Sequence, residues 1–212
     1  MTIIVTGAAG LIGSHLCDLL FENGNHVIGI DDLSFGNINN INKKIEFHKI
    51  DLSKENSLIN FKNIDVICHL ASYKKSFVAE TSSFDVMDIN FGMSKEVIRF
   101  CKNSNTKLLF TSTSDIYGNS KNFLENEQIT LGPPTVQRYS YALSKLHTEQ
   151  LILNEVDDKR ICAVIARIFG CASPRSSKSW SGGHIPMFID RALSNKDILI
   201  HGDGLQTRSI SH

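Results

Sequence analysis

A tyrosine and a lysine four residues apart, Tyr141 and Lys145, form the pair in this sequence best suited to proton transfer. Residues at this spacing lie on one face of a helix, so the ammonium would lie near the phenol. An ammonium there favours the phenolate and would lower the pKa of the tyrosine from its usual value of about 10. Such a phenol is a general base for an alcohol or sugar hydroxyl, the proton half of a hydride transfer. The alternative is an ordinary solvated helix face.

A glycine-rich turn near the N-terminus predicts a dinucleotide site. Gly7, Gly10 and Gly13 separate a short apolar run from a helical stretch. Glycines allow a tight turn and close approach of the backbone to a pyrophosphate, and the following helix offers N–H groups and the positive end of its dipole. An ordinary glycine-rich strand–helix turn is the alternative reading of these residues.

Two acidic residues, Asp31 and Asp32, end the second apolar run. Their distance from the glycines is about that expected for an acid that binds ribose. We predict that Asp31 accepts hydrogen bonds from the adenosine ribose and repels a 2′-phosphate, which favours NAD over NADP as the cofactor. For Asp32 the alternative is a helix cap or a solvated loop acid.

The elements that must position these residues alternate between short apolar runs and longer helical stretches. Continuous apolar runs suit strands of a parallel sheet that is buried on both faces. The alternation predicts the α/β class, with right-handed βαβ units in a doubly wound parallel sheet of the Rossmann type. The predicted strands are residues 2–6, 26–30, 45–50, 64–70, 107–112 and 161–168, and the predicted helices are 12–23, 54–61, 80–103 and 140–156.

The character of the chain changes after residue 170. We predict an NAD-binding domain over residues 1–170 and the beginning of a smaller substrate-binding lobe, truncated at His212, over residues 171–212. A stretch rich in Ser, Pro, Gly and Arg predicts a loop over residues 171–183. A helix at 184–194 and a short strand at 198–200 are expected to follow it.

The composition excludes several other classes of protein. The 212 residues are 42% hydrophobic with a formal net charge of zero, which predicts a substantial core and no nucleic-acid or acidic-membrane surface. No apolar run approaches the roughly 18 residues of a membrane helix, and no signal peptide is recognisable. Five scattered cysteines without a Cys-x-x-Cys pair, and eight histidines without clustering, predict a reducing cytoplasm and no metal site.

Several motifs occur in a fixed order along the chain, and together they resemble the extended short-chain dehydrogenase/reductase family. The resemblance is to its NAD-dependent sugar-nucleotide epimerases, dehydratases and decarboxylases. The matching segments are the Gly-x-x-Gly-x-x-Gly turn at 7–13, His-Leu-Ala-Ser at 69–72 against the family's His-x-Ala-Ala/Gly, the strand end at 111–118 against Ser-Ser/Thr-x-x-Val-Tyr-Gly, the catalytic helix at 138–145, and Gly-Asp-Gly-x-Gln-x-Arg at 202–208.

The resemblance implies a role for each matching residue. Tyr141 and Lys145 would be the base and its pKa modulator, and Thr113 the hydroxyl partner of the substrate oxygen. The cofactor would be bound by Gly7, Gly10, Leu11, Ile12, Gly13, Asp31, Asp51, Leu52, Leu70, Ala71, Lys74, Asn90, Tyr141, Lys145 and Phe169. The substrate would be bound by Thr113, Gly170, Arg175, His184 and Arg208, with the two arginines on its diphosphate.

Structural alternatives remain open for several of these residues. Thr113 could be a β-branched residue at a sheet end, both arginines could form surface ion pairs, and His184 could simply begin a helix. His69 follows an apolar run and is expected to be a core histidine. Ser112 and Ser114 are expected to make local hydrogen bonds and not to act as catalysts.

The substrate side departs from the family pattern, because Gly170 replaces an asparagine and Ala172-Ser173 replaces Tyr-Gly. Asp115 stands where the dehydratases and decarboxylases carry a carboxylate, usually Glu, so it is a candidate catalytic acid or base. A capping or supporting role for Asp115 is the alternative.

The function that the resemblance implies is an NAD-dependent 4-epimerase of a nucleotide-activated hexose, working through a 4-keto intermediate. A dehydratase or decarboxylase that uses Asp115 is the alternative within the family. An NAD-binding scaffold or sensor without catalysis is the alternative of another class, and it would be expected to lack Tyr141 or Lys145. The family also implies a homodimer in which helices 80–103 and 140–156 form a four-helix bundle.

Overall fold

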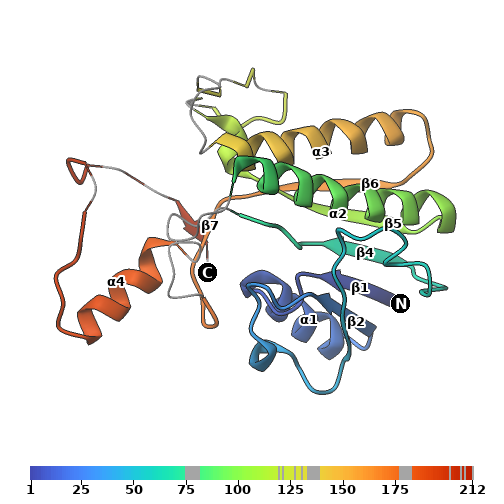
Figure 1. Ribbon diagram of the computed structural model, residues 1–212, viewed down its shortest axis with the longest axis horizontal. Coiled ribbons are helices and arrows are strands. Elements are labelled where there is room, and N and C mark those ends of the chain that lie inside the picture. The colour runs from blue at the N-terminus through green and yellow to red at the C-terminus, as the bar shows by residue number, and fades with distance from the viewer. Residues whose placement is uncertain are drawn as a thin grey trace.

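A six-stranded parallel sheet with helices on both faces forms the body of the protein (Figure 1). The computed structural model describes residues 1–74, 82–118, 120, 122–126, 128–129, 131–132, 139–176, 183–200, 202–205, 207 and 209–211. The strands of the sheet are β1 (Thr2–Thr6), β2 (His26–Asp31), β3 (Glu46–Lys49), β4 (Val66–His69), β5 (Lys107–Thr113) and β6 (Ala163–Ile168).

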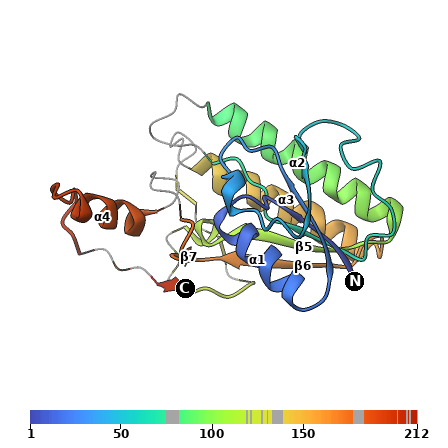
Figure 2. The same cartoon turned by 90° about the horizontal axis from the view of Figure 1, so that it is seen from below.

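The helices are α1 (Leu11–Glu22), α2 (Ser83–Ser104), α3 (Ser140–Asp157) and α4 (His184–Leu193), with short 3-10 helices at Ile38–Asn40 and Ser114–Tyr117. Helix α1 covers one face of the sheet, while α2 and α3 lie side by side on the other (Figures 1 and 2). A small separate ladder joins β7 (Gly170–Cys171) to β8 (Ile210–Ser211).

The strand order is β3-β2-β1-β4-β5-β6, and every neighbouring pair in this sheet is parallel. The six predicted strands and the doubly wound topology are therefore confirmed. The order of the strands reverses between β1 and β4, and ligands of such sheets bind beyond the carboxyl ends of the strands at this switch point.

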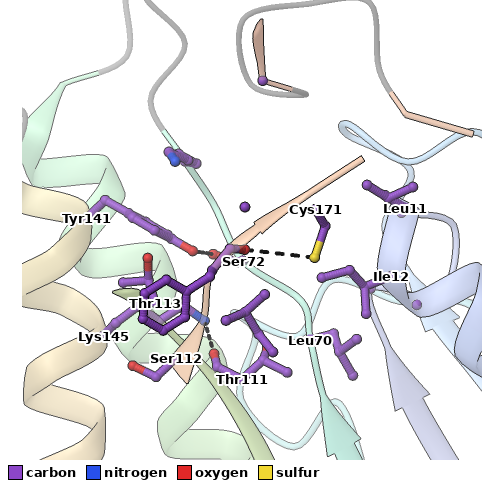
Figure 3. Close-up of a pocket in the computed structure, with 18 of the residues that line it drawn as sticks. Leu11, Ile12, Leu70, Ser72, Thr111, Ser112, Thr113, Tyr141, Lys145 and Cys171 are labelled. Atoms are coloured by element: carbon purple, nitrogen blue, oxygen red, sulfur yellow. Dashed lines mark hydrogen bonds between the residues drawn. The ribbon is translucent and has the colours of Figure 1, made fainter. Parts of the chain in front are cut away.

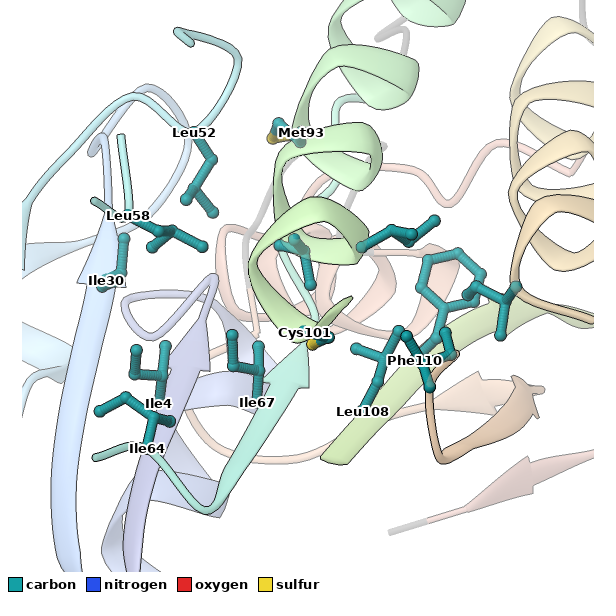
Figure 4. Packing of buried hydrophobic residues seen from close by; sticks show 14 of the residues in the cluster. Ile4, Ile30, Leu52, Leu58, Ile64, Ile67, Met93, Cys101, Leu108 and Phe110 are labelled. Carbon is teal, nitrogen blue, oxygen red and sulfur yellow. The ribbon is translucent and has the colours of Figure 1, made fainter. Parts of the chain in front are cut away.

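The core explains why the strands are continuously apolar. Alternate residues of one strand point to opposite faces, so Ile4 packs under α2 while its neighbours Ile3 and Val5 pack under α1. The larger cluster fills the space between the sheet and α2, with Ile30, Ile67 and Phe110 completely buried (Figure 4).

Helix α2 has sequence signals for both of its ends. Ser82 accepts a hydrogen bond from the Asp85 N–H, and the Asp85 carboxylate accepts one from the Ser82 N–H, which completes a capping box. At the other end Asn105 adopts a left-handed conformation with φ 54°, which ends the helix.

The helix predicted over residues 54–61 is wrong, because this segment is a series of turns. Asn56 has a φ of 59°, which a helix does not allow, and its carbonyl accepts a bond from Ile59 three residues later. Leu58 is still fully buried in the core. The buried Leu58 therefore belongs to a turn-rich connection and not to a helix.

The strand predicted over residues 198–200 is also wrong. These three residues are exposed and have no regular secondary structure, and no described strand pairs with them. The ladder of this region forms instead between β7 and β8, and β7 ends at Cys171, the first residue of the predicted loop. The helix predicted at 184–194 is confirmed as α4.

Within the described ranges, no helix combines the length and the apolar character that would let it cross a membrane. The same residues contain no group of three or more His, Cys, Asp or Glu side chains arranged to hold a metal ion. All five cysteines are free thiols, and Cys17, Cys68 and Cys101 are buried in the core.

Candidate active site

A cavity of about 390 Å³ lies at the switch point, bounded by the glycine turn, the ends of β4, β5 and β6, and helix α3 (Figure 3). Most of the predicted site residues meet there. Those that line the cavity are Gly7, Gly10, Leu11, Ile12, Gly13, Leu70, Lys74, Thr113, Tyr141, Lys145, Phe169, Gly170 and His184.

The glycine turn packs its backbone so tightly that a side chain would not fit at two of its positions. The tight turn leaves the start of α1 open to a pyrophosphate. Gly7 has a φ of 70°, and a Cβ on it would lie 2.8 Å from the Ala71 backbone nitrogen. A Cβ on Gly13 would lie 2.0 Å from the Gly7 carbonyl oxygen. Gly10 is the N-cap of α1 and has no side chain to accept the N–H groups of the first turn. These donors therefore fit an anionic group, as the sequence predicts.

Asp31 lies at the end of β2, beside the glycine turn but outside the cavity lining. Its carboxylate accepts hydrogen bonds from the Ala9 N–H at 3.0 Å and the Leu33 N–H at 2.8 Å. Burial raises the pKa of Asp31, and the two N–H donors oppose that rise. A carboxylate has about four acceptor positions, so two remain for ribose hydroxyls. The residues of the turn and Asp31 thus fit the adenosine half of NAD.

Lys145 is buried and points from α3 to the end of β5. Its Nζ donates a hydrogen bond to the Thr111 carbonyl oxygen at 2.9 Å and lies 4.7 Å from the centroid of the Phe110 ring. Burial lowers the pKa of Lys145 to about 7, and the nearby Glu149 carboxylate opposes that shift. The Lys145 ammonium therefore has a backbone carbonyl as its hydrogen-bond partner.

Tyr141 also lines the cavity, but the prediction that Lys145 lowers its pKa is wrong for this structure. Burial raises the pKa of the Tyr141 phenol, and the Asp115 carboxylate adds to the rise. A hydrogen bond from the Ser72 hydroxyl to Tyr141 Oη, at 3.4 Å, opposes it. Figure 3 shows Tyr141 and Ser72 pointing toward one another, while Lys145 turns to Thr111. Lys145 donates its hydrogen bond to the Thr111 carbonyl oxygen, and it is not among the groups that shift the pKa of the phenol.

The floor of the cavity is held by hydrogen bonds between β1 and β4. The Thr6 hydroxyl bonds His69 Nδ1 at 2.8 Å and accepts the N–H groups of Leu70 and Ala71 at 3.1 Å each. His69 is almost completely buried, and burial lowers its pKa to about 3. It is thus a neutral core histidine, as predicted. At the end of β5, Thr113 lines the cavity and accepts the Asp115 N–H at 3.2 Å.

Four further residues predicted to bind the cofactor do not line the cavity. Asn90 is buried and bonds both backbone groups of Tyr73 and the Ser144 hydroxyl, so it joins the loop after β4 to α3. Leu52 is buried in the core, and Asp51 accepts bonds from the Ser53 N–H and hydroxyl. Ala71 packs behind the glycine turn.

The predicted substrate residues are only partly assembled. Asp115 lies outside the cavity lining, and its carboxylate is 3.8 Å from Lys74 Nζ. Arg175 forms a 2.8 Å ion pair with Asp18 of α1, which is the structural alternative for that residue. His184 lines the cavity and packs against Phe188. Arg208 lies outside the described residues.

Sequence reasoning missed several residues of the cavity. Ser72 and Cys171 carry polar groups there, and Ser112 is buried with a hydroxyl that has no partner in the described part of the chain, contrary to the local bond expected of it. Ser72 and Ser112 lie inside matched motifs, and Cys171 follows Gly170, so the resemblance was the signal that could have found them. The other missed lining residues are Thr111, Ile168, Gly183, Ile185, Pro186 and Ile210.

The fold and the cavity define the class of protein: a Rossmann-type dinucleotide-binding chain with a tyrosine–lysine pair at the switch point. The chain belongs to the NAD dependent epimerase/dehydratase family, whose model matches residues 3–212. NAD is the cofactor of this family and agrees with the glycine turn and Asp31.

Three known proteins illustrate the range of this similarity. The chain is 34% identical to a putative UDP-glucose 4-epimerase of Methanocaldococcus jannaschii over 97% of this chain and 68% of that protein. It is 30% identical to a UDP-N-acetyl-alpha-D-glucosaminuronate decarboxylase of Bacillus cytotoxicus over 99% of this chain and 66% of that protein. A UDP-glucuronic acid 4-epimerase of Bacillus cereus, solved in complex with NAD, superposes with a TM-score of 0.85 at 28% identity, over 100% of this chain and 68% of that one.

Proposed function

We propose that this chain acts as an NAD-dependent sugar-nucleotide 4-epimerase on a UDP-hexose type of substrate. The observation that carries the proposal is that Thr113, Tyr141 and Lys145 line one cavity while Asp115 does not. Epimerisation at C4 requires one hydroxyl to lose and regain its proton. It does not require a carboxylate at the position of Asp115.

In the proposed mechanism Tyr141 accepts the proton of the sugar 4-hydroxyl and later returns it. Thr113 donates a hydrogen bond to the same substrate oxygen. Lys145 binds the nicotinamide ribose of NAD, which lies next to C4 of the sugar. When bound, oxidised NAD supplies the hydride acceptor and a positive charge that favours the phenolate of Tyr141. The 4-keto sugar turns within the cavity and exposes its other face before reduction.

A decarboxylase or dehydratase remains the second candidate, because the Bacillus cytotoxicus decarboxylase is among the similar proteins and Asp115 lies near Tyr141. In this alternative the Asp115 carboxylate would separate from Lys74 and turn to the substrate. An NAD-binding protein without catalysis is the third candidate, and the presence of both Tyr141 and Lys145 argues against it.

Product analysis separates the three candidates. The chain is mixed with NAD and, in turn, UDP-glucose, UDP-N-acetylglucosamine and UDP-glucuronic acid, and the sugar is followed by proton NMR. We expect inversion at C4 with every carbon retained. Loss of carbon dioxide would indicate a decarboxylase, a 4-keto-6-deoxy sugar would indicate a dehydratase, and NAD binding without any product would indicate the non-catalytic protein.

We also propose a homodimer through α2 and α3. Both helices present apolar side chains to solvent, among them Phe84, Met87 and Leu153, and Phe91 stacks on His147 across the two helices at 5.1 Å. Two copies of this surface would form a four-helix bundle. Sedimentation of the parent and of Phe84→Glu tests it: a parent dimer that the substitution dissociates supports the proposal, and a monomeric parent contradicts it.

A further inference from the structure

The hydroxyl that reaches the Tyr141 phenol belongs to Ser72, in the loop after β4. Ser72 Oγ donates to Tyr141 Oη at 3.4 Å, and no other hydrogen bond to that oxygen occurs among the described residues. The lysine expected in this role, Lys145, donates instead to the Thr111 carbonyl. The family motif that this segment resembles, His-x-Ala-Ala/Gly, has Ala or Gly where this chain has Ser72.

Ser72 is held firmly relative to the helix that carries Tyr141. On one side of it the Ala71 N–H donates to the buried Thr6 hydroxyl, and on the other both backbone groups of Tyr73 bond Asn90. Asn90 also donates to the hydroxyl of Ser144, three residues along α3 from Tyr141. The residues on both sides of Ser72 are therefore fixed by hydrogen bonds, one of which, from Asn90 to Ser144, is buried and reaches the helix of Tyr141.

The charged and titratable groups around the phenol act in opposite directions. Lys74 lies 4.9 Å from the centroid of the Tyr141 ring, and its Nζ is 3.8 Å from the Asp115 carboxylate, so the two charges partly cancel. Lys145 lies on the same helix but faces Thr111, and His184 lines the cavity from α4. Ser72 is thus the neutral donor aimed directly at the phenolic oxygen.

We propose that Ser72 is a positioning residue for proton transfer, which donates a hydrogen bond to Tyr141 and stabilises its phenolate. The inference rests on the proposed role of Tyr141 as the base. In the step, the substrate proton forms a bond to the phenolate oxygen while Ser72 keeps its own proton throughout. A hydrogen bond to a charged oxygen is shorter and stronger than one to a neutral oxygen. The donor therefore favours the ionised form, which is the form that accepts the proton.

The test is a titration of the tyrosine side chains in the protein saturated with NAD. The chain has four tyrosines, so 13C labelling of the phenol carbon gives few signals, and Tyr141→Phe identifies the one that matters. Ser72→Ala removes the donor, Ser72→Thr retains a hydroxyl, and Ser112→Ala removes a hydroxyl of the same cavity that has no partner in the described residues.

We expect Ser72→Ala to raise the midpoint of the Tyr141 titration by about one pH unit, which is about tenfold less phenolate at a given pH below the midpoint. Ser72→Thr and Ser112→Ala should keep the parent midpoint, and the Tyr117 signal should not move in any variant if the fold is intact. The inference is overturned if Ser72→Ala keeps the parent midpoint, if Ser72→Thr shifts as far as Ser72→Ala, or if the parent phenol does not ionise before the protein unfolds.

The titration needs no sugar substrate. A shifted midpoint in a protein that turns over no sugar nucleotide would leave the hydrogen bond from Ser72 to the Tyr141 phenolate standing and refute the proposed epimerase. If Ser72→Ala leaves the midpoint unshifted in an enzyme that epimerises sugar nucleotides, the proposed function stands and the inference about Ser72 is refuted.

Discussion

The cofactor side and the substrate side of this protein are held together in different ways. Before residue 162, two apolar clusters pack against the two faces of the sheet, and cavity residues are joined by hydrogen bonds such as that from Lys145 to the Thr111 carbonyl oxygen. After Ile161 no described residue is buried, and Ile189 and Leu193 of α4 are 55% and 84% exposed. On that side Arg175 is held by a surface ion pair.

This difference separates the site residues that the packed fold holds in place from those that it does not. The glycine turn, Asp31, Tyr141 and Lys145 have positions set by the sheet and by α3. Of the residues expected to bind the sugar nucleotide, Thr113 is buried at the end of β5, whereas Gly170, Arg175 and His184 follow Ile161 and are not buried. The chain spans 66% and 68% of the decarboxylase and the putative epimerase to which it is similar, and substrate recognition therefore remains a proposal.

The largest expected effect is on the glycine turn. Gly13→Val should abolish measurable NAD binding, because even a Cβ at this position would lie 2.0 Å from the Gly7 carbonyl oxygen and the turn would have to move. Gly24→Ala is the matched control: Gly24 has a φ of 78° but open space around it, so the substitution should cost about 1 kcal/mol of stability and leave NAD binding intact. Calorimetric NAD titrations of both variants decide the matter, and normal affinity in Gly13→Val would refute the assigned turn.

Cofactor choice should be the next largest effect. The Asp31 carboxylate stands where a 2′-phosphate would be repelled, so NAD should bind more tightly than NADP by on the order of 2–4 kcal/mol. Both dissociation constants can be measured by calorimetry, with Asp31→Asn as the variant in which the difference narrows. Equal or tighter binding of NADP by the parent would show that Asp31 does not contact the ribose.

A buried lysine should make stability depend on pH. Burial lowers the pKa of Lys145 to about 7, whereas an unfolded lysine keeps its proton up to about pH 10. Because of this lysine the unfolded state binds more protons in this window, so Lys145 should add about 2 kcal/mol to the free energy of unfolding from about pH 7 to about pH 9. The buried thiols of Cys17, Cys68 and Cys101, whose pKa values are raised, act in the opposite direction. Urea titrations of the parent and of Lys145→Met isolate the lysine, because the thiols contribute equally to both, and the slope of the parent should exceed that of the variant by this amount. The same slope in both proteins would mean that Lys145 keeps its proton in the fold.

The smallest expected effect is that of Asp115→Asn on turnover, and it tests the substrate side of the site. If the enzyme is an epimerase, Asp115→Asn should change turnover by no more than a few-fold, because no carboxylate has to move a proton. A decarboxylase or dehydratase would lose about 10²-fold. Steady-state rates with UDP-glucose and UDP-glucuronic acid distinguish the two, and Lys74→Met reports separately on the loss of the ion pair.

The elements that the sequence predicts correctly are those whose burial leaves a pattern along the chain. Strands buried on both faces leave continuous apolar runs, so the sheet was predictable. The glycine turn was predictable from the spacing of its glycines. The segment 54–61 was not, because Leu58 satisfies an apolar pattern from within turns. The bond from Lys145 to the Thr111 carbonyl and that from Ser72 to Tyr141 join segments 34 and 69 residues apart, and only the packing of α3 on the sheet creates them.

The proposed role of Tyr141 as the general base is tested most directly by the rate of C4 inversion of a UDP-hexose. The rate is measured for the parent chain and for Tyr141→Phe, with NAD affinity measured alongside. We predict that the parent interconverts the two C4 epimers, and that the variant keeps its NAD affinity while its turnover falls by roughly 10²-fold or more, the scale of a lost general base. A variant that retains most of the parent rate would contradict the assignment of Tyr141 as the base.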